Sequence, residues 1–355
     1  MISNHATLIH KNPNRANSWR FIVGGLLVSS IMLGTSVAHA ATAITQPLQG
    51  AFGPGGKDYP YGSVRITQGG SGYNAYYVFE PISPQPVSAP LVIINHGYLE
   101  FTGYKMHRDL IMHTVRKGNV VIYPRWQTLL WAPCAGSFSS EKCMASATKG
   151  IVDGIASLQA DAKRVQPELD KTSYFGFSYG GIITANITNR WASLHLPKPR
   201  VIFLDEPHDG GFQGLTEPAL DKDLSGIPSN VLIQCHVGEK GVISEKNSSM
   251  SSCNTLFPRL AHIPESNKNL VMAYTDDHGS PALASGHGIS MAPTTDAYDY
   301  NFVWKTFDAM RSCALEGKDC AYGMGDTPEH RFNGLWSDGV PVKPLKIQTT
   351  SPIAP

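Results

Sequence analysis

The sequence predicts an α/β fold, in which a mostly parallel sheet is covered by helices on both faces. Short continuous apolar runs such as Leu91–Asn95 (LVIIN) are typical of strands buried on both faces. These runs alternate along the chain with longer helical patterns, as they do in parallel sheets. Two half-exposed, alternating stretches come before the series and predict an antiparallel edge. No internal repeat and no long linker divides the chain, which indicates one domain.

Each element of this fold is placed by its own run of residues. The predicted strands are Ser63–Gln68, Ala75–Phe79, Leu91–Asn95, Val120–Tyr123, Thr172–Phe177, Val201–Leu204, Val231–Gln234 and Leu270–Tyr274. The predicted helices are Tyr104–Lys117 (closed by Gly118), Ala147–Val165, Tyr179–Trp191 and Asp296–Leu315. Residues 42–61 and the C-terminal tail from about residue 316 to 355 are expected to be irregular. Ligands bind beyond the C-terminal ends of parallel strands, so the residues that follow each strand are the candidates for chemistry.

Composition excludes several classes of protein. The chain has 355 residues, of which 42% are hydrophobic and 16% are charged, and its formal net charge is +1. So small a charge creates no field that favours nucleic acid or an anionic membrane surface. The apolar fraction is sufficient for a large core, so we expect a globular chain and not a disordered one.

The first forty residues have the pattern of a secretory signal. Lys11, Arg15 and Arg20 are their only charged residues, and they precede an apolar run at Phe21–Val37 and the small-residue site Ala38-His39-Ala40. We expect cleavage after this site, because seventeen residues are short for a membrane span. A transmembrane anchor is the alternative. The mature chain, residues 41–355, would be secreted or periplasmic, would have no stable membrane span and would carry a charge of −2.

Six cysteines follow the signal: Cys134, Cys143, Cys235, Cys253, Cys313 and Cys320. No Cys-x-x-Cys pair occurs among them, so zinc ribbons and thioredoxin-type sites are not supported. An even count in an oxidising compartment favours disulfides. Their order predicts three local pairs, 134–143, 235–253 and 313–320, with buried free thiols as the alternative.

One short motif carries the strongest indication of chemistry. Gly176-Phe177-Ser178-Tyr179-Gly180 matches the pattern G-x-S-x-G. This motif requires a strand that runs into a helix with the serine on the sharp turn between them, and the apolar run before Ser178 and the helical pattern after it supply that context. We therefore predict that Ser178 is a nucleophile. An ordinary tight turn is the alternative.

A second motif, His96-Gly97-Tyr98, follows the strand Leu91–Asn95. A flexible glycine at this point lets a backbone N–H point at a substrate oxygen, beside the N–H of the residue after the nucleophile. The backbone amides of Tyr98 and Tyr179 are therefore expected to form an oxyanion hole. His96 is expected to be a packed structural histidine.

A histidine and an acid complete the predicted triad. His278 lies just past the last strand of the series, and we predict it as the general base, with His287 as its rival. Asp205 and Glu239 each follow a strand, where a carboxylate would fix the tautomer of the histidine. Asp205 is preferred because its short apolar strand brings it out level with Ser178, and Glu239 is the alternative acid.

With serine, acid and histidine in this order, the chain resembles the α/β-hydrolase superfamily over about residues 62–315. The segment LDEPHDGG, with Asp205 27 residues after Ser178, looks like the chlorophyllase and platelet-activating-factor acetylhydrolase branch. The segment INHGY and the His278 loop also resemble polyester-hydrolysing cutinases, whose acid comes one strand later. The G-D-x-D pattern common there appears here as Gly238-Glu239-Lys240-Gly241, and this departure favours Asp205.

The resemblance implies an α/β-hydrolase fold with a sheet of about eight strands. Together with the signal segment and the low charge, it implies a secreted serine esterase that cleaves small or polymeric esters through an acyl-enzyme, with no metal, no cofactor and no nucleic acid. Trp126 and Trp131 are candidates for an acyl pocket, although buried structural tryptophans fit equally well. No counterpart is recognised for residues 332–345. A secreted peptidase or amidase of this fold and a non-catalytic binding protein are the alternatives.

Overall fold

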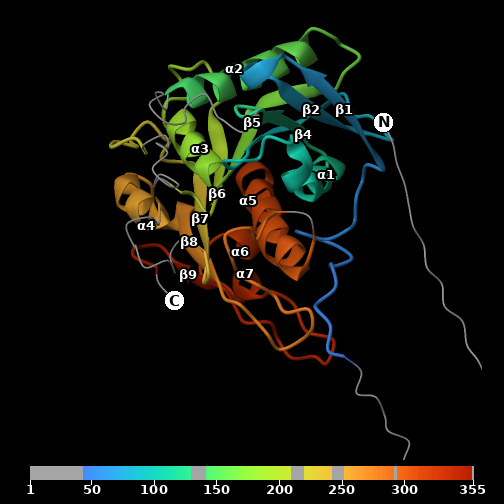
Figure 1. Ribbon diagram of the computed structural model, residues 1–355, viewed down its shortest axis with the longest axis vertical. Helices are drawn as coiled ribbons and strands as arrows, with labels where there is room; N and C mark the ends of the chain where they lie inside the picture. Colours follow the sequence, from blue (N-terminus) through green and yellow to red (C-terminus); the bar gives the residue numbers. More distant parts are fainter. Residues whose placement is uncertain (1–42, 129–140, 209–219, 242–251, 292–293, 354–355) are drawn as a thin grey trace, which may run out of the picture. The chain divides into compact units, whose positions relative to one another are not determined.

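A single nine-stranded sheet forms the centre of the computed structural model, which describes residues 43–353 except 129–140, 209–219, 242–251 and 292–293 (Figure 1). The strand order is β1-β2-β4-β3-β5-β6-β7-β8-β9. The strands are β1 (Ser63–Gly69), β2 (Tyr76–Ile82), β3 (Ser88–Asn95), β4 (Val120–Pro124), β5 (Gln166–Phe177), β6 (Pro199–Asp205), β7 (Leu232–Gly238), β8 (Lys268–Ala273) and β9 (Lys346–Gln348). Neighbouring strands from β4 to β8 are parallel, whereas β1, β2 and β9 pair antiparallel. The predicted mostly parallel sheet is confirmed, and each of the eight predicted strands has its counterpart.

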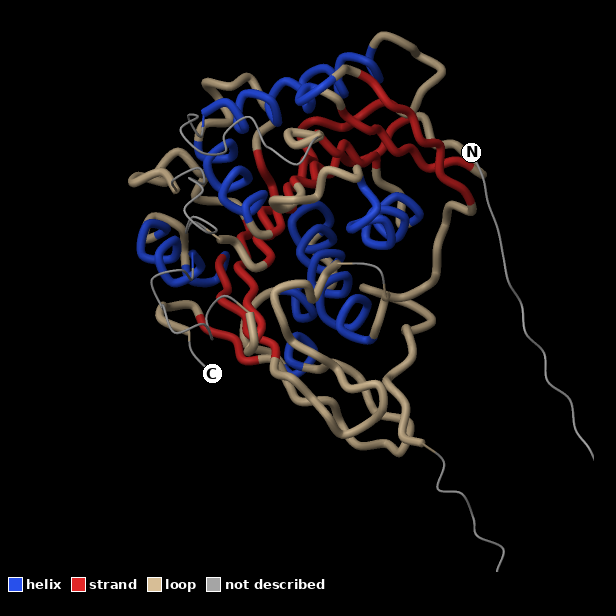
Figure 2. The backbone as a smooth tube through the Cα atoms, viewed as in Figure 1, coloured by secondary structure: helices blue, strands red, loops and turns tan. Residues whose placement is uncertain are grey.

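Helices cover both faces of this sheet (Figures 1 and 2). Helices α1 and α5, with the π-helix η7, lie on one face, and α2, α3 and α4 lie on the other. The α-helices are α1 (Arg108–Arg116), α2 (Glu141–Gln159), α3 (Tyr179–Asn189), α4 (Ser252–Leu256), α5 (Lys305–Glu316), α6 (Cys320–Gly323) and α7 (Pro328–Arg331). The shorter turns are η1 (Gly72–Asn74), η2 (Tyr104–His107), η5 (Phe257–Leu260), η6 (Glu265–Asn267) and η7 (Asp299–Trp304).

Helix α2 ends earlier than the predicted helix, which was expected to run to Val165. The side chain of Asp161 accepts a hydrogen bond from the N–H of Lys163 at 2.9 Å, and its carbonyl accepts one from Arg164 at 2.9 Å. A short acidic side chain that bonds the following backbone favours a turn over a continued helix. The helix therefore ends at Gln159, just before this aspartate, and the chain enters β5 at residue 166.

Alternation along β5 divides the core into two layers. Tyr174 faces the side of α2 and α3, whereas Phe175 and Phe177 face the side of α5. Phe175 stacks on Phe203 with a ring distance of 5.2 Å and meets Phe307 of α5 edge-on at 5.6 Å. These fully buried rings hold the middle strands in place, and the C-terminal ends of β5 and β6 are thereby fixed next to each other.

The C-terminal tail is more ordered than expected. It contains α6 and α7, and its strand β9 pairs with β8, so it extends the sheet by one strand that the sequence did not predict. The ammonium group of Lys305 in α5 is buried and donates to the carbonyls of Glu329 and His330 in α7 at 3.0 and 3.1 Å. Three backbone hydrogen bonds of this kind, the third to Phe332, anchor the tail to α5.

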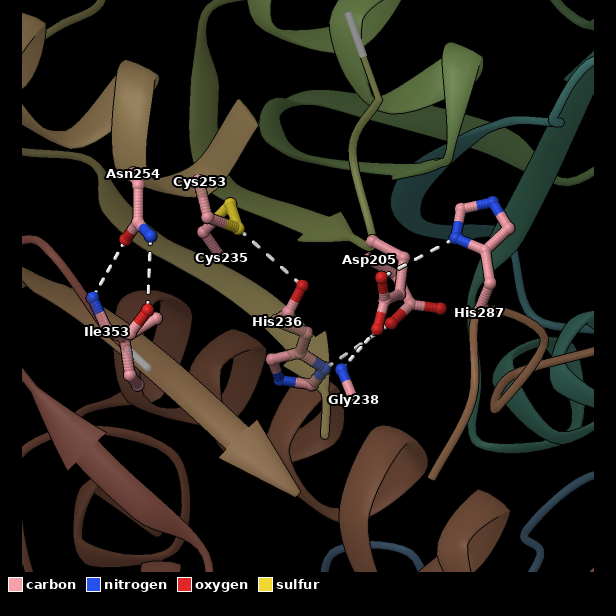
Figure 3. The surroundings of a disulfide bond; sticks show 9 residues. Asp205, Cys235, His236, Gly238, Cys253, Asn254, His287 and Ile353 are labelled. Atoms are coloured by element: carbon pink, nitrogen blue, oxygen red, sulfur yellow. Dashed lines mark hydrogen bonds and ion pairs between the residues drawn. A yellow bond between two sulfur atoms is a disulfide. The ribbon is translucent and has the colours of Figure 1, made fainter. Parts of the chain in front are cut away.

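Two of the three predicted disulfides are confirmed. Cys235 in β7 joins Cys253 in α4 (Figure 3), and Cys313 in α5 joins Cys320 in α6. Cys134 lies outside the described residues, so the pairing 134–143 stays a prediction. The expected signal at residues 1–40 also lies outside them. No helix among the described residues is both long enough and apolar enough to cross a bilayer.

The two disulfides are expected to stabilise the fold unequally. Cys235 and Cys253 are 18 residues apart, and Cys313 and Cys320 are 7 apart. Loop-closure entropy then predicts losses of about 3 and about 2 kcal/mol when each pair is replaced by alanine. Denaturant unfolding of the two double variants measures both losses. An equal or reversed order would contradict an entropic origin.

Candidate active site

Ser178 lies on a sharp turn between β5 and α3, as predicted. Its backbone adopts φ 52° and ψ −124°, a conformation that is strained for any residue with a Cβ. A Cβ on Gly176 would overlap the carbonyl oxygen of Gly180, and a Cβ on Gly180 would overlap that of His96. Both glycines of the motif are therefore required for the strand, the helix and the loop after β3 to meet at this serine.

The histidine that reaches the serine is His287. Its Nε2 lies 2.9 Å from Ser178 Oγ, and its ring packs on Phe177 with a centroid distance of 5.0 Å. Its side chain is 41% exposed, so the imidazole is accessible to solvent. His287 was the rival in the sequence, and the structure favours it over His278.

Glu206 supplies the carboxylate behind this histidine. Its Oε2 lies 3.4 Å from His287 Nδ1, and its side chain is fully buried. Its Oε1 accepts a close hydrogen bond from the N–H of Gly238 at the end of β7. Ser178, His287 and Glu206 thus form a continuous chain of two hydrogen bonds.

Glu206 is not among the acids predicted from the sequence, where the glycine at position 241 favours Asp205 instead. A Cβ on Gly241 would overlap the carboxylate of Glu206, so this glycine leaves the space that the acid occupies. Gly241 is the residue at which the sequence departs from the pattern with its acid one strand later. Glu206 itself has a φ of 48°, which turns its side chain out of the alternation of β6.

The prediction of His278 as the base is not supported by its position. Its Nε2 bonds Asp338 Oδ2 at 2.7 Å, and its ring lies 5.8 Å from that of Trp336. The reason is a small hairpin after β8, in which the backbones of Asp276 and Leu283 pair in both directions at 2.8 and 2.9 Å. His278 lies within the hairpin and contacts the tail, and the chain reaches Ser178 only after the hairpin has closed.

Asp205, the predicted acid, does not bond the histidine at the serine. It is the last residue of β6, and alternation places its side chain on the same face as Phe203. There its Oδ2 accepts a close hydrogen bond from Ser290 Oγ, and its Oδ1 lies 3.6 Å from Nδ1 of His236. Figure 3 shows His236 and His287 on opposite sides of Asp205.

Glu239, the alternative acid, is engaged in the backbone next to β8. Its Oε2 accepts a hydrogen bond from the N–H of Thr275 at 2.8 Å, and its own N–H donates to Ala273 at 2.8 Å. These bonds hold together the ends of β7 and β8. The carboxylate of Glu239 therefore has a structural role, and not the catalytic role that the sequence allowed as an alternative.

The residues expected to form the oxyanion hole lie next to each other. Tyr179 is the first residue of α3, and its ring lies 5.7 Å from that of Tyr98 in the loop after β3. The buried carboxylate of Glu100 shapes this loop, because its Oε1 accepts the N–H of Gly97 at 2.8 Å and its Oε2 lies 2.9 Å from Nε2 of His107. Burial alone would raise the pKa of Glu100, but His107 holds it below the usual value, so the group is ionised.

His96 is a packed histidine, in agreement with its expected role. It is fully buried, and burial lowers its pKa to about 4, so the ring is neutral near pH 7. Its ring stacks on Trp126 at 4.4 Å, and Trp126 in turn stacks on Tyr179 at 5.0 Å. Trp126 is completely buried and supports the site from behind, so it does not line an open pocket. Trp131 lies outside the described residues.

In the described part of the chain, no group of three or more His, Cys, Asp or Glu side chains is arranged to hold a metal ion.

Comparison with known proteins supports the fold alone. No protein-family model matches the sequence, and no curated protein matches it. Among solved structures, the chain is similar to an esterase from the fungus Rhizomucor miehei, with a TM-score of 0.50 and 13% sequence identity over 72% of this chain and 84% of the other. The α/β fold expected from the sequence, a mostly parallel sheet covered by helices, is therefore confirmed. The similarity does not distinguish the chlorophyllase-like branch from the cutinase-like one.

The two histidines are expected to behave differently toward a phosphonate probe. Such a probe should label Ser178 in the intact protein, because Nε2 of His287 can accept the proton of its hydroxyl. His287→Ala should slow labelling by about 10³-fold or more, whereas His278→Ala should label at nearly the wild-type rate. Ser178→Ala is the control without label. Mass spectrometry of the labelled peptide measures each rate, and the opposite order would return the base to His278.

Proposed function

We propose that this protein is a serine hydrolase that cleaves carboxylic esters through an acyl-enzyme. The observation that carries the proposal is the chain of hydrogen bonds from Ser178 through His287 to the buried Glu206, built on a strained strand–helix turn. A serine hydroxyl is a weak nucleophile until a base accepts its proton, and this arrangement supplies that base. The fold shared with a fungal esterase supports esters as the substrate class.

In the first half of the reaction, Ser178 Oγ attacks the ester carbonyl while His287 Nε2 takes its proton. The imidazolium then gives this proton to the leaving alcohol, and the acyl group stays on the serine. Glu206 accepts a hydrogen bond from Nδ1–H of His287, which fixes the tautomer and stabilises the imidazolium. Because the second oxygen of Glu206 is held by the N–H of Gly238, the carboxylate cannot rotate away from the ring.

In the second half, a water molecule takes the place of the alcohol. His287 accepts a proton from the water, which attacks the acyl carbon, and returns the proton to Ser178 as the acid leaves. The partial exposure of the His287 side chain is consistent with access for the water and the alcohol. No step of this reaction requires a metal or a cofactor.

The backbone amides of Tyr98 and Tyr179 are the proposed oxyanion donors in both halves. Tyr179 stands at the N-terminus of α3, where backbone N–H groups point out of the helix. The Glu100–His107 pair keeps the loop of Tyr98 in place, and the N–H of Leu99 is held by Gln127 at 2.7 Å. Donors fixed before the reaction stabilise the oxyanion by several kcal/mol.

Export completes the proposal. Residues 1–40 are proposed to be a cleaved signal, and the two disulfides support a secreted or periplasmic location. The substrate is proposed to be a small or polymeric ester. No nucleic acid is proposed as a partner.

Hydrolysis of p-nitrophenyl esters of graded chain length tests this function. The wild type should hydrolyse them, and Glu206→Gln should lower kcat by about 10³–10⁴-fold, since a histidine without its orienting carboxylate adopts the wrong tautomer. Glu239→Gln is the matched control and should retain most activity. The p-nitroanilides with the same acyl groups separate an esterase from a peptidase or amidase. A wild type inactive on every ester, or a larger loss in Glu239→Gln than in Glu206→Gln, would contradict the proposal.

A further inference from the structure

Asp205 is bonded to both the nucleophile and the segment that carries the base. Its backbone carbonyl accepts the N–H of Ser178 at 2.9 Å. Its side-chain Oδ2 accepts the hydroxyl of Ser290, which follows His287 by three residues. One residue therefore connects the turn that carries the serine with the segment that carries the histidine.

The two ends of the histidine segment are held in different ways. Before His287, Ser285 donates its hydroxyl to the carbonyl of Ala273 at 2.8 Å, and its own carbonyl accepts the N–H of Lys240 at 2.8 Å. After His287, the N–H of Met291 closes a turn onto Gly288 at 3.0 Å, and this turn is tied to the sheet by the bond from Ser290 to Asp205. Among the described residues, the downstream turn is therefore held to the sheet by the Ser290–Asp205 hydrogen bond, beside the packing of Ile289 in the core.

This hydrogen bond lies in the interior of the protein. Asp205 and His236 are fully buried, and Ser290 is 2% exposed. The ring of His236 stacks on Phe302 at 4.2 Å, and burial lowers its pKa although Asp205 opposes the shift, so it is a neutral neighbour. In such surroundings the loss of one partner leaves the other polar group without its hydrogen bond, which is costly.

We propose that Asp205 is a positioning residue that holds His287 against Ser178 through Ser290. The inference rests on the proposed function and deepens it, because it assigns a second carboxylate to the same site. Asp205 does not touch the imidazole of His287 and does not exchange a proton with it. It limits the movement of the segment from which that imidazole projects, whereas Glu206 orients the ring itself.

Loss of this anchor should affect the chemical step more than substrate binding. A displacement of a catalytic group by about 1 Å can lower the rate by about 10²-fold. We therefore expect Ser290→Ala and Asp205→Ala each to lower kcat by about 10- to 100-fold, while KM changes by less than about threefold. Asparagine keeps an oxygen that accepts the hydroxyl, so Asp205→Asn should restore most of the activity lost in Asp205→Ala.

The experiment is a double-mutant cycle on the full chain with a p-nitrophenyl ester. Because the two side chains act through one bond, the double variant Asp205→Ala/Ser290→Ala should lose no more than the larger single loss. Thr306→Val is the matched control, since it removes an equally buried hydroxyl from α5, where Thr306 bonds the carbonyl of Phe302 at 2.7 Å. Thermal unfolding of every variant identifies any loss due to misfolding.

Each outcome separates this inference from the proposed function. An active wild type in which Ser290→Ala behaves like Thr306→Val, or in which the two losses are additive, overturns the anchor and leaves the esterase proposal intact. A loss in Asp205→Asn as large as in Glu206→Gln would make Asp205 the triad acid and overturn its positioning role. A wild type that neither hydrolyses esters nor reacts with a phosphonate overturns both.

Discussion

A ladder of backbone hydrogen bonds at the C-terminal edge of the sheet determines where the groups of the site stand. The residue that follows each of three neighbouring strands donates its N–H to a carbonyl at or near the end of the next strand. The pairs are Ser178 with Asp205 at 2.9 Å, Glu206 with His236 at 3.0 Å and Glu239 with Ala273 at 2.8 Å. Parallel strands in register end at one level, so this ladder brings three polar residues to one line. The three side chains nevertheless reach different surroundings, because the backbone leaves each strand in a different direction.

Two of these residues leave the ladder with a strained backbone. Ser178 and Glu206 both have positive φ angles, and each such conformation costs on the order of 1–3 kcal/mol. The strain turns both side chains into the space that His287 enters. Space for them comes from glycines: Gly180 lets the loop after β3 approach the serine, and Gly241 leaves room for the acid. The geometry of the site therefore depends on these two glycines as well as on the catalytic side chains.

The C-terminal tail decides which histidine is available to the site. Asp276 accepts the N–H of Lys343 at 2.8 Å and the indole N–H of Trp336 at 3.3 Å, both from the tail. Burial would raise the pKa of Asp276, but these donors and the N–H of His278 hold it below the usual value, so it stays ionised. The hairpin after β8 is thereby fixed to residues 332–345, and His278 is bound by Asp338. The tail thus packs against the loop that precedes His287.

The sequence by itself determined eight of the nine described strands, the turn that carries Ser178 and two of the disulfides. These features follow from short-range patterns: apolar runs, flanking glycines and cysteines close in the chain. The choice of His287 over His278 needed the hairpin and its contact with a tail 60 residues away, which no local pattern contains. The choice of Glu206 over Asp205 needed one positive φ angle at a strand end, together with the space left by Gly241 on another strand. Neighbouring residues in a sequence can face opposite sides of a sheet, so only the tertiary structure decided which carboxylate meets the histidine.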